Sequence, residues 1–262
     1  MNGLCEFNEL GATMRLVARL PPILDALESF HGHQSPSWPT DPYPFLIWWH
    51  CGYPASEERC ARGWESLNAD TDIAPETLLA IPSARLARAL KPGGMIPELR
   101  AERLKLVAQR VREQGDLRAA LSRLPLPKAR TLLKKFPGIA DPGADRILLF
   151  AGIAPIPAVP SSTPQVAVRI DSGRDGDNYN ADYRESQQIL ASQVADTFEA
   201  RTRAYLLLLR HGQEVCKRTG PLCDTCPIAK ACAFFAPARG HRTGAPRGRV
   251  MARRPTRKNP SS

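Results

Sequence analysis

The order of apolar and polar residues predicts helices along most of the chain. Within residues 9–30, apolar side chains recur mostly at three- and four-residue steps, the repeat of an amphipathic helix. Pro21 and Pro22 fall in the middle of this stretch and are expected to split it. Similar patterns predict helices over residues 75–90, 97–113, 117–124, 127–135, 186–198 and 201–210. The predicted fold class is therefore all-α.

Two polar stretches and one apolar stretch complete this pattern. Residues 31–44 are rich in Pro, Ser and His and predict a loop. We expect His31 and His33 in it to be solvent-exposed, because no cysteine or carboxylate pattern accompanies them as metal ligands. Residues 170–185 are polar, lack the spacing of an EF-hand and predict a second loop. Residues 45–49 (FLIWW) predict a buried helix, with Trp48 and Trp49 in the core.

Four cysteines lie close together near the end of the chain, with six, two and five residues between them: Cys216, Cys223, Cys226 and Cys232. Four thiolates this close predict one inorganic site, either zinc or an iron-sulfur cluster. Structural zinc sites usually have two CxxC-type pairs, and only one is present. We therefore expect a 4Fe-4S cluster, with zinc as the alternative. The other cysteines (Cys5, Cys51 and Cys60) are expected to be buried or inert, and their odd number favours a reducing cytoplasm.

A second motif lies upstream, at residues 136–143 (FPGIADPG). Gly138 permits a tight turn between two helices, and Asp141 followed by Pro142 is expected to cap and begin the second helix. Backbone N–H groups of residues 138–140, with the N-terminus of that helix, would form an anion site that suits one phosphate. The alternative is a plain helix-helix turn. Basic residues are expected on the outward face of the preceding helix: Lys128, Arg130, Lys134 and Lys135.

The two motifs together resemble the endonuclease III family of base-excision DNA-repair proteins, which have a helix-hairpin-helix motif and a C-terminal 4Fe-4S loop. The order agrees, since Phe136 lies eighty residues before Cys216, and the resemblance covers residues 44–232. It implies two helical lobes with a DNA cleft between them. The expected parts are an N-terminal helix and linker (1–43) that packs with the cluster lobe, a hairpin lobe (44–159), a cluster lobe (160–236) and a basic tail (237–262).

The resemblance also implies a partner and a set of contacts. The partner would be damaged double-stranded DNA, bound by a monomer. The residues that would contact the DNA are Pro137, Gly138, Ile139, Ala140, Gly143, Lys217 and Arg218. The implied activity is extrusion of a damaged base and cleavage of its N-glycosidic bond.

Two positions depart from the family. In an ungapped alignment of the hairpins, the lysine that attacks the sugar falls on Pro142, and the catalytic aspartate falls on Pro160. Proline forms no Schiff base, which excludes a lyase step through that lysine. Replacement carboxylates would be Asp141, Asp145 or Asp171, but these have simpler explanations as a helix cap, an exposed helix residue and a loop residue. Three functions stay open: a glycosylase with a relocated carboxylate, a catalytically silent DNA-binding relative, and a zinc-stabilised structural or interaction protein.

Charge is concentrated at the C-terminal end. The chain has 36 basic and 26 acidic residues, a net charge of +10. Residues 237–262 contain eight of the basic residues and no acidic one, so residues 1–236 carry a net charge of only +2. A DNA site in the folded part must therefore be a local patch, while the tail is expected to be disordered and either solvated or attracted to phosphates. No apolar run is long enough for a membrane span, and we expect a cytoplasmic protein.

Overall fold

The computed structural model describes residues 20–175 and 178–235. All regular secondary structure in these residues is helical, which confirms the predicted fold class. The helices are α1 (Leu20–His31), α2 (Pro42–Gly52), α3 (Glu57–Asp70), α4 (Pro75–Ala80), α5 (Ser83–Leu90), α6 (Pro97–Gln114), α7 (Leu117–Arg123), α8 (Leu126–Leu133), α9 (Asp141–Phe150), α10 (Gln165–Ser172), α11 (Tyr179–Gln193) and α12 (Phe198–Glu214), with 3-10 turns at η1 (Lys91–Gly93) and η2 (Cys223–Thr225).

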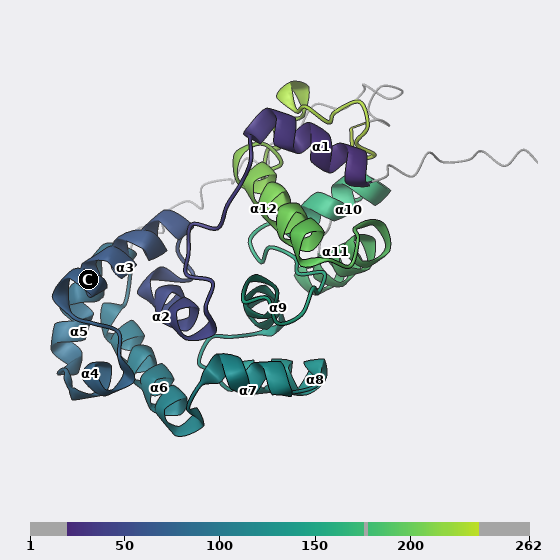
Figure 1. The fold of residues 1–262 in the computed structure, drawn as a ribbon. Helices are drawn as coiled ribbons and strands as arrows, with labels where there is room; N and C mark the ends of the chain where they lie inside the picture. Colours follow the sequence, from purple (N-terminus) through teal and green to yellow (C-terminus); the bar gives the residue numbers. More distant parts are fainter. Residues whose placement is uncertain (1–19, 176–177, 236–262) are drawn as a thin grey trace, which may run out of the picture.

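The helices form two lobes, each with its own apolar core (Figure 1). The hairpin lobe contains α2 to α8, and the cluster lobe contains α1, α10, α11 and α12. Helix α9 lies between the lobes. Apolar residues of α1 pack with α10, α11 and α12, so the first described helix belongs to the same core as the last one.

Helix α2 is the centre of the hairpin lobe. Its sequence is apolar on every face, and all its residues from Phe45 to Gly52 are buried. The helix begins cleanly because the Asp41 side chain accepts a hydrogen bond from the N–H of Tyr43, and Pro42 occupies the first turn, where no N–H is needed. Neither α2 nor any other described helix is long and apolar enough to cross a membrane.

A buried arginine joins the two lobes through α9. The Arg146 guanidinium carbon lies 3.7 Å from the centre of the Trp38 ring, within the distance at which a cation attracts the face of an aromatic ring. Arg146 also makes an ion pair with Glu57 at 2.8 Å, and only 6% of its side chain is exposed. Tyr205 of α12 contacts the Phe150 ring at the end of α9. Side chains from α2, the segment before it and α12 thus pack around one face of α9.

Several predicted elements have different bounds in the structure. The helix expected over residues 75–90 is divided into α4 and α5, because Pro82 cannot continue the first helix. The loop expected over residues 170–185 was too long, since α10 continues to Ser172 and α11 begins at Tyr179, where Asn178 caps it. Pro21 and Pro22 lie in the first turn of α1, and the part of the expected helix before Leu20 lies outside the described residues.

The expected exposure of His31 was also wrong. His33 is solvent-exposed as predicted, with 84% of its side chain accessible, whereas only 2% of the His31 side chain is accessible. Helix α1 ends at His31, one residue beyond the predicted end, and this places His31 against α12.

Candidate nucleic-acid interface

The hairpin motif is formed by α8, the turn over residues 134–140 and α9. Phe136 and Ile139 are buried and fix the turn to the lobe, while Gly138 and Ala140 are exposed. Gly138 has φ +68°, a left-handed conformation that favours glycine. The N–H of Ile139 bonds to Phe136, but the N–H groups of Gly138 and Ala140 find no acceptor among residues 20–175 and 178–235. These two donors remain available to an anion.

Two side chains of α2, Trp49 and His50, lie next to this turn. A Cβ atom added to Gly138 would lie 3.5 Å from Cε1 of His50 and 4.0 Å from Nε1 of Trp49. Both nitrogens, Nε1 of Trp49 and Nε2 of His50, are buried without a hydrogen-bond partner in the described part of the chain. Burial lowers the pKa of His50 to about 4, so its ring is neutral at physiological pH.

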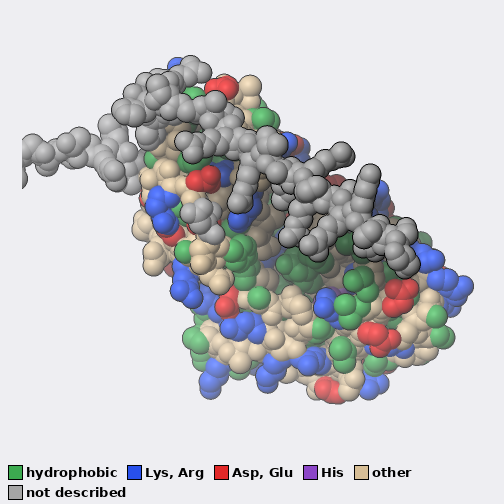
Figure 2. Space-filling model, turned by 180° about the vertical axis from the view of Figure 1, so that it is seen from behind, with side chains coloured by type: hydrophobic (Ala, Val, Ile, Leu, Met, Phe, Trp, Pro, Cys, Tyr) green, Lys and Arg blue, Asp and Glu red, His purple; other side chains and the backbone are tan. Residues whose placement is uncertain are grey.

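The basic patch beside the hairpin is smaller than predicted. Arg130 does not point into solvent but bonds to Asp145, and Lys134 makes an ion pair with Asp141 at 2.7 Å. Lys128 and Lys135 make no ion pair with any described carboxylate. Figure 2 shows Lys and Arg side chains along the edge of the molecule that carries α6, α7 and α8.

A cavity of about 580 Å³ opens beside the hairpin, between the two lobes. Gly138, Ala140 and Gly143 of the hairpin contribute to its lining. Aromatic residues also line it: Trp49 stacks on Tyr53 with ring centres 3.9 Å apart, and Tyr179 lies parallel to Tyr183. A volume of this size accommodates a small organic ligand, and flat aromatic side chains suit a planar one.

The two positions that depart from the resembled family lie at this cavity. Pro142 lines it, and Pro160 is buried directly before Ser161, which also lines it. The structure thus brings the hairpin and the segment after α9 to one cavity, but neither family position offers an amine or a carboxylate.

Asp145 is buried rather than exposed, which corrects the sequence interpretation. Only 1% of its side chain is accessible, and both oxygens are occupied. Oδ1 accepts from Nε of Arg130 at 2.6 Å, and Oδ2 accepts from the Tyr183 hydroxyl and from Nε2 of Gln187, each at 2.8 Å. Burial and the neighbouring carboxylate raise the pKa of Tyr183, so its hydroxyl keeps the proton that it donates.

The other two candidate aspartates have different surroundings. Asp141 lines the cavity and is 59% exposed; it is the first residue of α9, whose cap is Ala140, so the expected capping role was wrong. Asp171 lies in α10 rather than in a loop, and it accepts a hydrogen bond from Gln193 at 2.6 Å. It does not line the cavity.

The four clustered cysteines line a small common cavity of their own in the cluster lobe, closed by apolar residues such as Ile170 and Leu222. Buried Arg169 holds this loop: its guanidinium donates to the carbonyl oxygens of Lys217 and Arg218, at 2.8 and 2.9 Å. The side chains of Lys217 and Arg218 are exposed. Burial raises the pKa of the Cys226 thiol to about 11, so metal binding must displace its proton.

The cysteine loop brings together four side chains of the kind that bind zinc or an iron-sulfur cluster. No group of three or more ligand side chains in the described part of the chain is placed to hold one metal ion. Four thiolates around one zinc would have to converge on a single point, because Zn–S bonds are about 2.3 Å long. In a 4Fe-4S cluster each thiolate binds a different iron, so the four sulfurs line a wider space. Of the remaining cysteines, Cys51 and Cys60 are buried as predicted, and Cys5 lies outside the described residues.

The two-lobed helical fold of this chain is shared by solved structures of endonuclease III and of DNA glycosylases. A non-covalent endonuclease III–DNA complex has this fold: it aligns over 84% of this chain and 96% of its own, with a TM-score of 0.65 and 17% identity. A thermostable thymine-DNA glycosylase aligns over 82% and 96%, with a TM-score of 0.63 and 20% identity.

A third such structure is the H. pylori 3-methyladenine DNA glycosylase (MagIII) bound to 1,N6-ethenoadenine, which aligns over 74% of this chain and 96% of its own, with a TM-score of 0.54 and 17% identity. At these identities the likeness establishes the fold, and at that level it confirms the resemblance predicted from the sequence. No family model and no curated protein matches the chain.

The residues of α11 that line the cavity were not predicted from the sequence. Tyr179, Tyr183 and Gln187 follow one another at four-residue steps and therefore lie on one face of α11. This spacing was visible in the sequence, but the polar residues around it predicted a loop. Tyr53, by contrast, carries no sequence signal that separates it from an ordinary residue after a helix.

Proposed function

We propose that the chain binds damaged duplex DNA and takes one extruded nucleotide into the cavity between its lobes. The observation that carries this proposal is the position of the hairpin donors. Gly138 and Ala140 offer unbonded N–H groups and also line the cavity, so a phosphate held there would place its own nucleotide at the cavity mouth. Tyr53 and Tyr179 would offer stacking surfaces to the base.

Base cleavage through the family's usual residues does not follow from this site. Pro142 offers no nucleophile, and Pro160 offers no carboxylate to activate water or stabilise a cationic sugar. Asp145 lines the cavity, but its oxygens already accept three hydrogen bonds. The function best supported is therefore that of a DNA-binding clamp that exposes a damaged nucleotide. A glycosylase that uses Asp141 is the second candidate, since this carboxylate lines the cavity and is exposed.

We further propose that Cys216, Cys223, Cys226 and Cys232 hold a 4Fe-4S cluster, with zinc as the alternative. Their position around one common apolar cavity supports the cluster. When bound, the cluster would cross-link the loop after α12 and fix Lys217 and Arg218 for contact with phosphates. Absorbance near 400 nm and iron in the purified protein would support the cluster, whereas a colourless protein with one zinc would contradict it.

The proposed function can be tested with duplexes that carry 2-aminopurine opposite or beside a panel of oxidised, deaminated, alkylated and abasic lesions. We expect tight binding that weakens with salt, and a rise of 2-aminopurine fluorescence as the base leaves the stack. Binding to undamaged and damaged duplexes alike, with no fluorescence change, would contradict extrusion. Release of free base that is lost in Asp141→Asn would instead establish the second candidate.

The hairpin itself can be tested with Gly138→Ala. Alanine is strained at φ +68°, so we expect a loss of about 1 kcal/mol of stability and about tenfold weaker DNA binding as the turn donors shift. Gly152 is a matched control, because its φ is +67°, a Cβ there meets nothing within 4 Å, and it does not line the cavity. Gly152→Ala should lose similar stability and keep its DNA affinity. Equal affinities for both variants would exclude the hairpin as the phosphate site.

A further inference from the structure

Two buried histidines connect the surface of the cluster lobe to one of the four clustered cysteines. Nδ1 of His31 lies 3.1 Å from Oε2 of Glu214, and Nε2 of His31 lies 3.2 Å from Nδ1 of His211. Nε2 of His211 lies 3.6 Å from Sγ of Cys226, within hydrogen-bond distance for sulfur. We call Glu214, His31 and His211 the histidine array.

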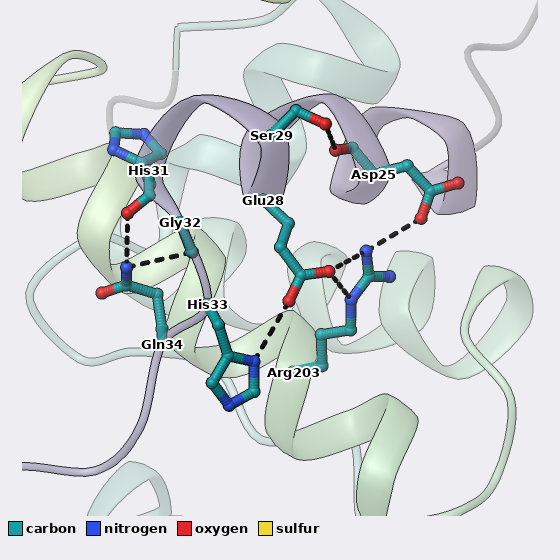
Figure 3. Close-up of polar contacts among 8 residues, drawn as sticks. All are labelled: Asp25, Glu28, Ser29, His31, Gly32, His33, Gln34 and Arg203. Carbon is teal, nitrogen blue, oxygen red and sulfur yellow. Dashed lines mark hydrogen bonds and ion pairs between the residues drawn. The ribbon is translucent and has the colours of Figure 1, made fainter.

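The histidine array draws on segments far apart in the sequence. His31 is the last residue of α1, whereas His211 and Glu214 lie in the last turn of α12. Figure 3 shows how the end of α1 is fixed: Arg203 of α12 lies between Asp25 and Glu28, His33 contacts Glu28, and His31 is turned away from this group. The docking of α1 therefore decides whether His31 reaches His211.

The cost of burying these rings argues that their polarity has a use. His211 is 1% exposed and the His31 side chain 2%, beside the apolar core of the cluster lobe. A buried polar group destabilises the fold unless every polar atom is bonded, and an aliphatic side chain would avoid that cost. Here all four ring nitrogens have a partner. The chain of contacts is complete, and it ends on a cysteine sulfur.

The direction of the hydrogen bonds follows from the state of the sulfur. A cysteine bound to a metal has no proton and can only accept, so His211 would donate Nε2–H to Cys226 and accept at Nδ1 from Nε2–H of His31. Nδ1 of His31 and the carboxylate of Glu214 then share one proton across their 3.1 Å contact.

We propose that His211, oriented by His31, donates a hydrogen bond to the Cys226 sulfur and thereby raises the reduction potential of the cluster. The inference rests on the proposed cluster. Reduction adds negative charge that spreads onto the ligating sulfurs, and a donor at one of them stabilises the reduced state more than the oxidised one. His211 and His31 are positioning residues. Helix α1 would thus set a property of the cluster without supplying a ligand.

A second donor in the same loop is independent of the histidine array. Nη1 of Arg169 lies 3.6 Å from Sγ of Cys216. It approaches from α10 and contacts neither histidine, so removal of the histidine array would leave this contact in place. We therefore expect a shift of the potential, not a loss of cluster binding.

The test is voltammetry of the purified full chain, with iron content and the electron paramagnetic resonance spectrum of the paramagnetic cluster state measured on the same samples. His211→Phe keeps the ring shape and removes the donor, and His31→Phe removes the orienting group without touching a cysteine. Both are expected to lower the reduction potential and alter the spectrum at unchanged iron content. His211→Gln keeps an amide N–H, so its potential should lie between those of the wild type and His211→Phe. His33→Phe is the matched control, because His33 is exposed on the same segment, and its potential should equal that of the wild type.

The outcomes separate this inference from the proposed cofactor. A wild-type protein without iron would overturn both. Full iron content with equal potentials in the wild type, His211→Phe and His31→Phe would overturn only the role of the histidine array. If His211→Phe lost its iron, the reduction potential of His31→Phe alone would test the inference. A lowered potential supports it, and an unchanged potential overturns it.

Discussion

Replacing Arg169 with methionine is expected to lower the midpoint of thermal unfolding by about 10 °C and to abolish metal binding by the cysteine loop. The Arg169 side chain is 1% exposed. It donates to the carbonyl oxygens of Lys217 and Arg218, to the carboxylate of Asp175 and to the sulfur of Cys216. Methionine fills the space of the stem but donates no hydrogen bond, which leaves these acceptors without their partner. Loss of such a buried network destabilises by about 3 kcal/mol or more.

The measurement is a thermal melt followed by circular dichroism, with metal content determined on the same preparation. Arg174→Met is the matched control, because Arg174 lies just after α10, is 56% exposed and bonds only to Glu185 among the described residues. Its ion pair is on the surface, so the control should change stability by less than about 1 kcal/mol. Equal melting midpoints and metal contents for Arg169→Met and the wild type would show that the loop closes without this arginine.

The parts of the fold that the sequence predicted depend on local patterns. Apolar steps of three and four residues predicted helices that the structure contains, because one buried face is enough to specify a helix against a core. The hairpin was visible because Gly138 allows a conformation that few other residues adopt. The cysteine loop was visible because its spacing is rare by chance.

The parts that it did not predict depend on contacts between distant segments. Asp145 reads as an ordinary polar residue on α9, and only the docking of α11, which brings Tyr183 and Gln187, makes it buried. His31 reads as part of a polar loop, and only the docking of α1 on α12 buries it. Such burial is a property of how the lobes pack and has no local signal in the chain.

Asp145 and His31 have the same physical role in different parts of the structure. Each is a titratable side chain whose polar atoms are all bonded by groups from another helix, so each fixes how two helices meet. A buried polar network of this kind tolerates few alternative packings, because every shift leaves a polar atom unpaired. At Asp145 the network also forms part of the cavity wall.

Replacing Asp145 with asparagine is therefore expected to lower the melting midpoint by about 10 °C, through loss of about 3 kcal/mol of stability. The amide offers one acceptor oxygen in place of two. Its NH2 group must therefore face a donor, either Arg130 or the Tyr183–Gln187 pair. Asp141→Asn is the control at the same cavity: the exposed pair of Asp141 with Lys134 should contribute less than about 1 kcal/mol.

A double-mutant cycle with Tyr183→Phe decides what the Asp145 carboxylate does. If Asp145 holds α9 and α11 together, the two substitutions are coupled by about 1 kcal/mol or more, because the second removes a bond that the first has already weakened. DNA binding should then fall in proportion to the loss of folded protein. If Asp145 were instead a catalytic carboxylate, Asp145→Asn would abolish release of a damaged base while leaving the melting midpoint and the DNA affinity unchanged. With three donors already on its two oxygens, the carboxylate has little capacity left to accept a proton from water, and we expect the first result.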